Sequence, residues 1–188
     1  NPIENAEDSK EAAKEDLQKE NLTKNDFVIG IAASGRTPYS IGAVEYAKEL
    51  GASTGSIACN KNAKISSYVD FPIEIETGAE VLSGSTRMKA GTATKLVLNM
   101  ITTTAMIKIG KVYDNLMVDV RPTNEKLVDR ATKIISEISG CDYEKSNKLL
   151  KEAENNVKLA IIMATKDVDY EKASEILEKN KGFIREDL

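Results

Sequence analysis

Two short segments combine hydroxyl side chains and glycine at points where a turn opens a helix. The first segment, Ser34-Gly35-Arg36-Thr37, follows an apolar run and precedes Pro38. Backbone N–H groups and hydroxyls at such a turn point to where an anion would sit, and Gly35 would let the backbone approach that anion. An ordinary turn, with a threonine cap and a proline at the first helical position, explains the same residues. The segment alone leaves both interpretations open.

The second segment, Ser83-Gly84-Ser85-Thr86-Arg87-Met88-Lys89, places hydroxyls and cations at the expected start of a long helix. A helix N-terminus disfavours cations. Arg87 and Lys89 therefore indicate either a bound anion or an acidic neighbour, for which Glu80 is the candidate. A capped helix with solvated cations is the alternative, and it is the simpler interpretation of this segment taken alone.

Three acidic residues, Glu4, Glu7 and Asp8, precede the first expected helix. Carboxylates at this place normally interact with the dipole and the free amides of the helix. A catalytic carboxylate looks the same in sequence, so the pattern by itself does not show one. The two cysteines, Cys59 and Cys141, are interpreted as packed residues.

The composition narrows the chemistry that these residues could perform. Histidine is absent, which excludes Ser-His-Asp and Cys-His catalysis and histidine metal sites. Proton transfer must then use carboxylates, lysine, tyrosine or cysteine. With 26 basic and 30 acidic residues the net charge is −4, which is not the basic footprint of a nucleic-acid-binding protein. We expect no metal site and no nucleic-acid partner.

Cysteine usage and hydropathy indicate the compartment. The cysteines form no C-x-x-C pair and no disulfide framework, which fits a reducing compartment. The longest apolar run, residues 159–164, is far shorter than a membrane span, and the polar first residues are not a signal peptide. We therefore expect a cytoplasmic protein without a membrane segment. The first residue is not methionine, so we expect a processed or truncated chain.

The order of apolar runs and helical periodicity predicts an α/β architecture. Asp8 and Glu11 have the spacing of a capping box at the start of a helix. We expect helices over residues 9–20 and 39–50 and strands over 27–32, 56–59 and 71–75. A strand, a helix and a further strand in this order predict a right-handed crossover and a parallel sheet flanked by helices. Three strands are few for such a sheet, so we expect a partial one.

The remainder of the chain is expected to be helical. A long helix is predicted directly after Ser85-Thr86 and through about Ile109, with Gly110 as its end. Its many threonines are poor helix formers, so packing must hold it. We expect a small bundle of short helices over residues 124–139, 143–154, 156–164 and 170–180.

Taken together, these motifs resemble the N-acetylmuramic acid 6-phosphate etherases, which belong to the sugar isomerase (SIS) fold group. A strand followed by Ser-Gly-x-Thr alone would indicate only the wider SIS group. Several longer runs in one order are far more specific. The runs that carry the resemblance span residues 5–9, 30–39, 83–93, 98–100, 110–113, 115–120, 123–127 and 140–141.

The resemblance implies a lyase of peptidoglycan recycling. Such an enzyme cleaves the D-lactyl ether at C3 of N-acetylmuramic acid 6-phosphate and yields N-acetylglucosamine 6-phosphate and D-lactate. A base removes the C2 proton, an acid protonates the departing lactate, and water adds to the unsaturated intermediate. Two carboxylates suffice, without a cofactor. Glu7 matches one of the two family glutamates and is expected to be the C2 base, in a cleft that raises its pKa.

The resemblance also implies the remaining assignments. The phosphorylated amino sugar is expected to contact Ser34, Gly35, Arg36, Thr37, Glu80, Ser83, Ser85, Thr86 and Lys89. Residues 1–121 are expected to form a partial SIS-type sugar-phosphate-binding domain, and residues 122–188 a C-terminal helical subdomain. A homodimer is expected, because SIS proteins commonly build their sites between subunits.

The chain departs from the family pattern in one large respect. The family carries a further segment before the position of Asn1, with the first strand, a first phosphate loop and the other catalytic glutamate. We therefore expect this chain alone to have little or no etherase activity. Asn5 also replaces a glycine that is usual in the family. Two other functions remain open: a non-catalytic sugar-phosphate-binding regulator of the glucokinase regulatory protein type, and an SIS sugar-phosphate isomerase.

Overall fold

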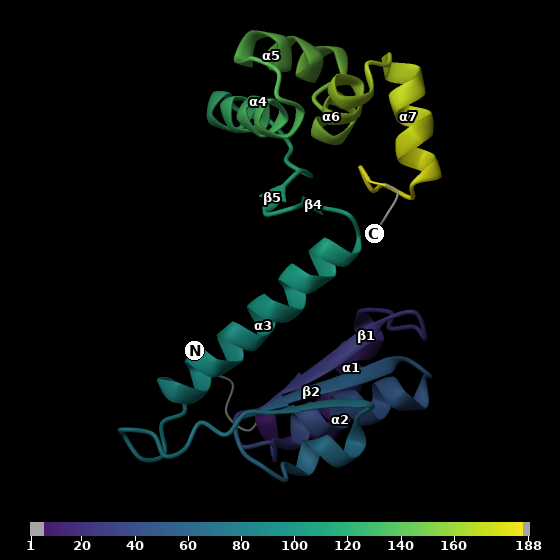
Figure 1. Cartoon of the computed structure of the whole chain (residues 1–188). Helices are drawn as coiled ribbons and strands as arrows, with labels where there is room; N and C mark the ends of the chain where they lie inside the picture. Colours follow the sequence, from purple (N-terminus) through teal and green to yellow (C-terminus); the bar gives the residue numbers. More distant parts are fainter. Residues whose placement is uncertain (1–5, 186–188) are drawn as a thin grey trace. The chain divides into compact units, whose positions relative to one another are not determined.

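The computed structural model describes residues 6–185, which form two compact units that divide after Asn99 (Figure 1). The first unit is an α/β structure, and the second consists mainly of helices. The elements of the first unit are the 3-10 turn η1 (Ala6–Asp8), α1 (Lys10–Lys19), β1 (Phe27–Ile31), α2 (Pro38–Glu49), β2 (Ser53–Ala58), the 3-10 turn η2 (Lys64–Tyr68) and β3 (Phe71–Glu74). Helix α3 (Lys89–Lys108) begins in this unit and continues into the second. The predicted fold class is confirmed.

A parallel three-stranded sheet with the order β1-β2-β3 forms the centre of the first unit. Phe27 pairs with Ser53, and Gly55 pairs with Phe71. β3 lies at an edge of the sheet, where Pro72 is tolerated because an edge strand needs fewer ladder hydrogen bonds. β2 begins at Ser53, earlier than predicted. Its first residues are small or polar, and the prediction relied on apolar runs.

Helix α2 supplies much of the core of this unit. Ile41 and Val44 are almost completely buried and pack with Ala58, Ile65 and other apolar residues of the β2–β3 connection. The predicted end of this helix at Leu50 is one residue too late. The helix ends at Glu49, and Leu50 is a half-exposed capping residue.

The cap of helix α1 also differs from the prediction. Ser9, and not Asp8, is the N-cap: its Oγ accepts a hydrogen bond from the Ala12 amide at 3.0 Å. The capping-box prediction placed the cap one residue too early. Both Asp8 and Ser9 are good N-cap residues, so their types alone do not decide between them.

After α3, the described part of the second unit contains a short hairpin and four helices. Strands β4 (Val112–Tyr113) and β5 (Leu116–Met117) pair antiparallel, and α4 (Glu125–Ser139), α5 (Tyr143–Glu152), α6 (Val157–Lys166) and α7 (Tyr170–Lys179) follow. Each helix has a capping side chain that accepts from the amide three residues on, namely Asn124, Asp142, Asn156 and Asp169. These strong caps explain why the predicted helix starts agree closely with the structure.

The core of the second unit includes the hairpin region as well as the helices. Val118 and Val120 are buried in one cluster with Ile135, Leu150 and Ile161. For this reason the compact unit begins within α3, ahead of the expected boundary between residues 121 and 122. That boundary stays a prediction. No helix among residues 6–185 is long and apolar enough to cross a membrane.

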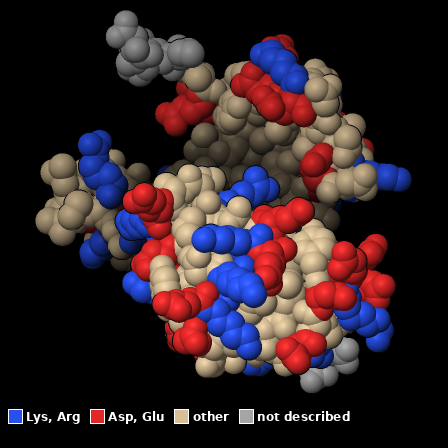
Figure 2. All heavy atoms as spheres, turned by 90° about the horizontal axis from the view of Figure 1, so that it is seen from above, with Lys and Arg blue, Asp and Glu red and all other residues tan. Residues whose placement is uncertain are grey.

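Acidic and basic side chains lie next to one another over the face drawn in Figure 2. This mixture agrees with the small net charge of −4. Several ion pairs join neighbouring elements, such as Lys10 of α1 with Glu45 of α2 at 2.7 Å. Exposed pairs of this kind contribute little to stability individually.

Candidate functional site

The turn between β1 and α2 lies at the carboxyl end of the parallel sheet. The strand ends at Ile31, residues 33–35 turn, and Pro38 starts the helix as predicted, with Thr37 as its N-cap. Ligands of open α/β sheets bind at this end of the strands. The turn therefore lies where sheets of this kind bind their ligands.

The hydroxyls of this turn differ in what they bind. Ser34 Oγ accepts a hydrogen bond from the Arg36 amide at 3.2 Å and so holds the turn. Thr37 forms no capping hydrogen bond with its side chain. Both residues are half-buried, whereas Arg36 is exposed. The Thr37 hydroxyl is thus the one that can reach a ligand without breaking a bond of the turn.

Gly35 has a structural role that its sequence position did not reveal. Its φ is +65°, and a Cβ at this position would lie 2.5 Å from Ala63 Cβ. Its carbonyl accepts from the Ile65 amide at 2.9 Å, which joins the turn to η2. Gly35 is therefore required for packing inside the unit, and its predicted contact with a ligand stays a prediction.

The end of β2 connects this turn to the first turns of α3. Cys59 N and Asn60 Nδ2 both donate to the Ala33 carbonyl, each at 2.9 Å. The buried Cys59 Sγ lies 3.6 Å from both the Ala90 carbonyl and Thr94 Oγ1. Cys59 is packed, as predicted, and it holds helix α3 against the carboxyl edge of the sheet.

A pocket of 370 Å³ lies where the turn after β1 meets α3. Its walls are formed by Ile31, Ala33, Thr86, Ala90, Gly91, Thr94, Lys95, Leu98 and Asn99. The lining includes Thr86 of the second predicted segment and Ala33, the residue that directly precedes the first segment. The lining does not include Ser34 and Thr37 of the first segment, or Ser83, Ser85 and Lys89 of the second.

Three polar side chains of this pocket, Thr94, Lys95 and Asn99, were missed by the sequence interpretation. All three lie within α3, away from any glycine-rich turn. Residues 90, 94 and 98, and likewise 91, 95 and 99, are four apart and share one face of a helix. This spacing was the available signal. Lys95 supplies a cation to a pocket that is lined by small and hydroxyl-bearing residues.

The second predicted segment precedes α3 instead of opening it. The helix begins at Lys89, so the prediction of a start directly after Thr86 is two residues too early. Residues 83–88 form turns, in which Arg87 Nε donates to Ser85 Oγ at 2.9 Å. The hydroxyls and glycine of this segment favour turns over helix, which explains the later start.

Glu80 is the acidic neighbour that the cations of this segment indicated. Its two carboxylate oxygens accept from the amides of Lys89 and Ala90, at 3.1 and 3.0 Å, and so cap helix α3. Lys89 Nζ donates to the Ala79 carbonyl at 2.7 Å. Glu80 therefore satisfies free helix amides, and its predicted contact with substrate stays a prediction.

The Glu80 cap makes a prediction for pH dependence. The hydrogen bonds from the Ala90 and Lys89 amides lower the pKa of Glu80 below its ordinary value of 4.5. A lowered pKa stabilises the fold above the ordinary value, and this stability is lost as the pH falls through the folded-state value. We expect wild-type urea stability to fall between pH 5 and 3 more steeply than that of Glu80→Gln. Parallel profiles of the two proteins would contradict the assignment.

Glu7 lies in η1 with an exposed side chain. The expectation that Glu7 sits in a cleft is wrong for the part of the chain that the structure describes, because none of these residues covers it. Glu4, the other glutamate of this acidic group, lies outside the described residues. Among residues 6–185, no group of three or more cysteine, aspartate and glutamate side chains could hold a metal ion.

Comparison with known families matches residues 4–104 to the SIS domain. This match covers more than half of the chain, including the sheet, both loops and the pocket. The chain belongs to the SIS domain family. Residues 114–158 match a second family, described as the C-terminal lid domain of glucokinase regulatory protein.

Individual relatives extend the similarity over nearly the whole length of this SIS chain. It is 59% identical over 186 residues to a protein of Exiguobacterium sp. named N-acetylmuramic acid 6-phosphate etherase. A protein of the same name from Geobacillus thermodenitrificans is 58% identical, and N-acetylmuramic acid 6-phosphate etherase 2 of Enterococcus faecalis is 56% identical. Each alignment covers 99% of this chain and 63% of the relative. The SIS chain therefore spans less than two thirds of the length of these relatives, and the resemblance found in its sequence is confirmed.

Proposed function

We propose that this chain is part of an N-acetylmuramic acid 6-phosphate etherase, a lyase that releases D-lactate and N-acetylglucosamine 6-phosphate. The observation that carries the proposal is the 56–59% identity, over 99% of the chain, to proteins of that name. The alignments cover both loop segments and the helical unit. The regulator and isomerase alternatives have no comparable support.

The pocket of 370 Å³ at the carboxyl edge of the sheet supports a site for the phosphorylated sugar. Lys95 offers a cation, and Thr86 and Thr94 offer hydroxyls. The β1–α2 turn begins at the lining residue Ala33, and its Thr37 hydroxyl forms no capping bond. Hydroxyls, turn amides and a lysine are the groups that bind a phosphate ester. We assign the phosphate to the side of the pocket nearest the β1–α2 turn.

The proposed reaction needs one group to remove the C2 proton and another to protonate the departing lactate oxygen. Glu7 is assigned as the base. Its exposure in this chain agrees with a site that is completed by the additional segment of the longer relatives, because a general base works best when it is partly desolvated. The second carboxylate is assigned to that additional segment.

The function is tested by measuring D-lactate release from N-acetylmuramic acid 6-phosphate. Two proteins are compared: this chain, and this chain completed by the additional segment of the Exiguobacterium relative. We expect release by the completed protein and little or none by the chain alone. Binding without release by the completed protein would support the regulator, aldose–ketose interconversion would support the isomerase, and full activity of the chain alone would refute the two-part site.

The hydroxyls of the first turn provide a further prediction. In the completed protein, Ser34→Ala and Thr37→Val are each expected to weaken sugar-phosphate binding by about tenfold, the effect of losing a hydrogen bond to a charged group. Thr37→Val should leave the free energy of unfolding unchanged, because no capping bond is lost. Ser34→Ala should lower it by about 1 kcal/mol, because one bond of the turn is lost.

The matched control for these two variants is Ser67→Ala. Ser67 Oγ donates to the Lys64 carbonyl at 2.9 Å in η2. Replacing Ser67 by alanine therefore removes one local hydrogen bond of a similar kind, away from the pocket. Affinity is measured by calorimetry and stability by urea unfolding. If Ser34→Ala and Thr37→Val bind as tightly as Ser67→Ala, the turn has only a structural role.

We also propose that the complete protein is a cytoplasmic homodimer. Support for self-association comes from large apolar side chains of α3 that are half or more exposed, among them Leu96 and Met100. Support for a reducing compartment comes from Cys59 and Cys141, which are both free thiols. Analytical ultracentrifugation and cell fractionation test the two statements separately.

A further inference from the structure

A second pocket, of 640 Å³, lies within the helical unit between the hairpin and α4. Its residues are Asn115, Leu116, Met117, Asn124, Lys126, Leu127, Asp129, Arg130, Lys133 and Ile134. All of them belong to residues 100–185, so the pocket does not depend on the SIS site. Its apolar floor comes from leucine and isoleucine side chains, and its polar rim carries three cations and two amides.

The cations of this pocket share one face of α4. Lys126, Arg130 and Lys133 follow one another at intervals of four and three residues, which places them along one side of a helix. Asp129 is the carboxylate among the described lining residues. The lining therefore carries a formal charge of +2 in a protein whose net charge is −4.

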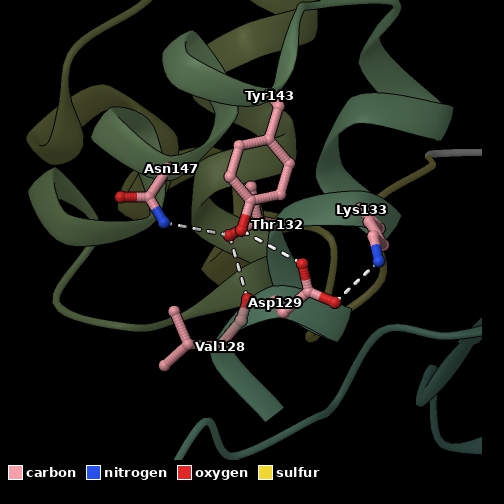
Figure 3. Close-up of polar contacts among 6 residues, drawn as sticks. All are labelled: Val128, Asp129, Thr132, Lys133, Tyr143 and Asn147. Atoms are coloured by element: carbon pink, nitrogen blue, oxygen red, sulfur yellow. Dashed lines mark hydrogen bonds and ion pairs between the residues drawn. The ribbon is translucent and has the colours of Figure 1, made fainter. Parts of the chain in front are cut away.

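The Asp129 carboxylate is already engaged, as Figure 3 shows. Lys133 Nζ donates to one of its oxygens at 2.7 Å, and the Tyr143 hydroxyl donates to the other at 3.1 Å. These bonds lower the pKa of Asp129, so the carboxylate stays charged and paired with Lys133. Tyr143 comes from α5, so this contact also fixes the carboxylate between two helices.

Lys126 and Arg130 have no carboxylate partner among the residues that the structure describes. Within residues 6–185, neither side chain forms an ion pair or a side-chain hydrogen bond. The amides of Asn115 and Asn124 stand on the same rim, and the Asn124 oxygen is occupied because it caps α4. Two unpaired cations above an apolar floor form a site that is complementary to a small anion with an apolar body.

We propose that this pocket binds a small organic anion. The anionic group would lie between Lys126 and Arg130, and the apolar body would contact Leu116, Leu127 and Ile134. A carboxylate and a phosphate ester share the required chemistry. This assignment does not rest on the etherase proposal, because it uses only residues of the helical unit.

The test is a titration of the ¹⁵N-labelled full chain, followed by amide chemical shifts. Two probes, butyrate and butyl phosphate, carry both an anionic group and an apolar body. Inorganic phosphate carries the charge alone, and butyramide carries the apolar body alone. We expect saturable shifts confined to residues 115–134, with a Kd of about 1 mM or below for at least one organic anion. The tighter of the two organic anions identifies the preferred charged group.

The variant for this test is the double substitution Lys126→Gln and Arg130→Gln. It should lower the affinity for the organic anion by at least about tenfold. The matched control is Lys151→Gln with Lys166→Gln, which removes the same charge from exposed positions of the same unit outside the pocket. The proposal is overturned by non-saturating shifts, by equal binding of butyramide or inorganic phosphate, or by an equal loss of affinity in the control.

Discussion

Replacing Glu7 by glutamine in the completed protein is expected to lower D-lactate release by about 10²–10⁴-fold, the usual contribution of a general base. Glutamine keeps the shape of the side chain and removes its ability to accept the C2 proton. The affinity for N-acetylmuramic acid 6-phosphate should therefore change little. Turnover is measured by D-lactate release and affinity by calorimetry on the same protein.

The matched control is Glu15→Gln, which removes a carboxylate from the exposed face of the neighbouring helix α1. It alters the net charge equally and should leave turnover unchanged. A Glu7→Gln protein with turnover equal to that of Glu15→Gln would return Glu7 to the ordinary role of a charge near a helix N-terminus. An unfolded Glu7→Gln protein is not expected, since the side chain is exposed.

The local rules of the sequence predicted the elements better than their ends. Helix starts with strong polar caps, such as Asn124 and Asp142, were placed correctly, because a capping side chain acts within three residues. The start of α3 was placed too early because its cap is Glu80, nine residues before Lys89. A capping contact across a loop leaves no fixed spacing in the sequence.

The sequence singled out two loop segments, and of their residues only Thr86 lines the pocket. Open α/β topology places ligand loops at the carboxyl edge of the sheet, so the two segments could be expected to meet. The contacts that bring them together run through Ala33, Cys59 and Ala90, mostly by backbone carbonyls. Backbone groups are common to all residues and carry no sequence signal. Lys95 was missed for another reason: a lysine in a helix is usually solvated, so its residue type alone does not indicate a binding site.

Burial was the property that the sequence predicted least well. Gly35 fits a ligand-binding turn by its type, yet the neighbour that forbids a side chain is Ala63 of the same unit. Glu7 was expected in a cleft and is exposed. In both cases the answer depends on which other chain segment packs nearby, which no local pattern encodes.

Gly42→Ala is expected to lower the free energy of unfolding of this chain by about 2 kcal/mol. Gly42 lies on the buried face of α2, and a Cβ there would stand 2.6 Å from Lys10 Cα and 2.7 Å from the Lys10 carbonyl oxygen. These are backbone atoms, so α1 and α2 must move apart. Overpacking of this kind costs about 1–3 kcal/mol, and it outweighs the gain of up to about 1 kcal/mol in helix propensity.

Gly91→Ala is the control that isolates the steric cost, since it makes the same change inside helix α3. The nearest atom to its added Cβ would be the Thr86 carbonyl oxygen at 3.7 Å, an ordinary contact. Only the gain in helix propensity should then remain, so Gly91→Ala is expected to be as stable as wild type or more stable by up to about 1 kcal/mol. Urea unfolding of the three proteins measures the difference. If Gly42→Ala unfolds at the same urea concentration as Gly91→Ala, α1 and α2 are not in the close contact that the structure describes, because the added methyl group would then have met open space.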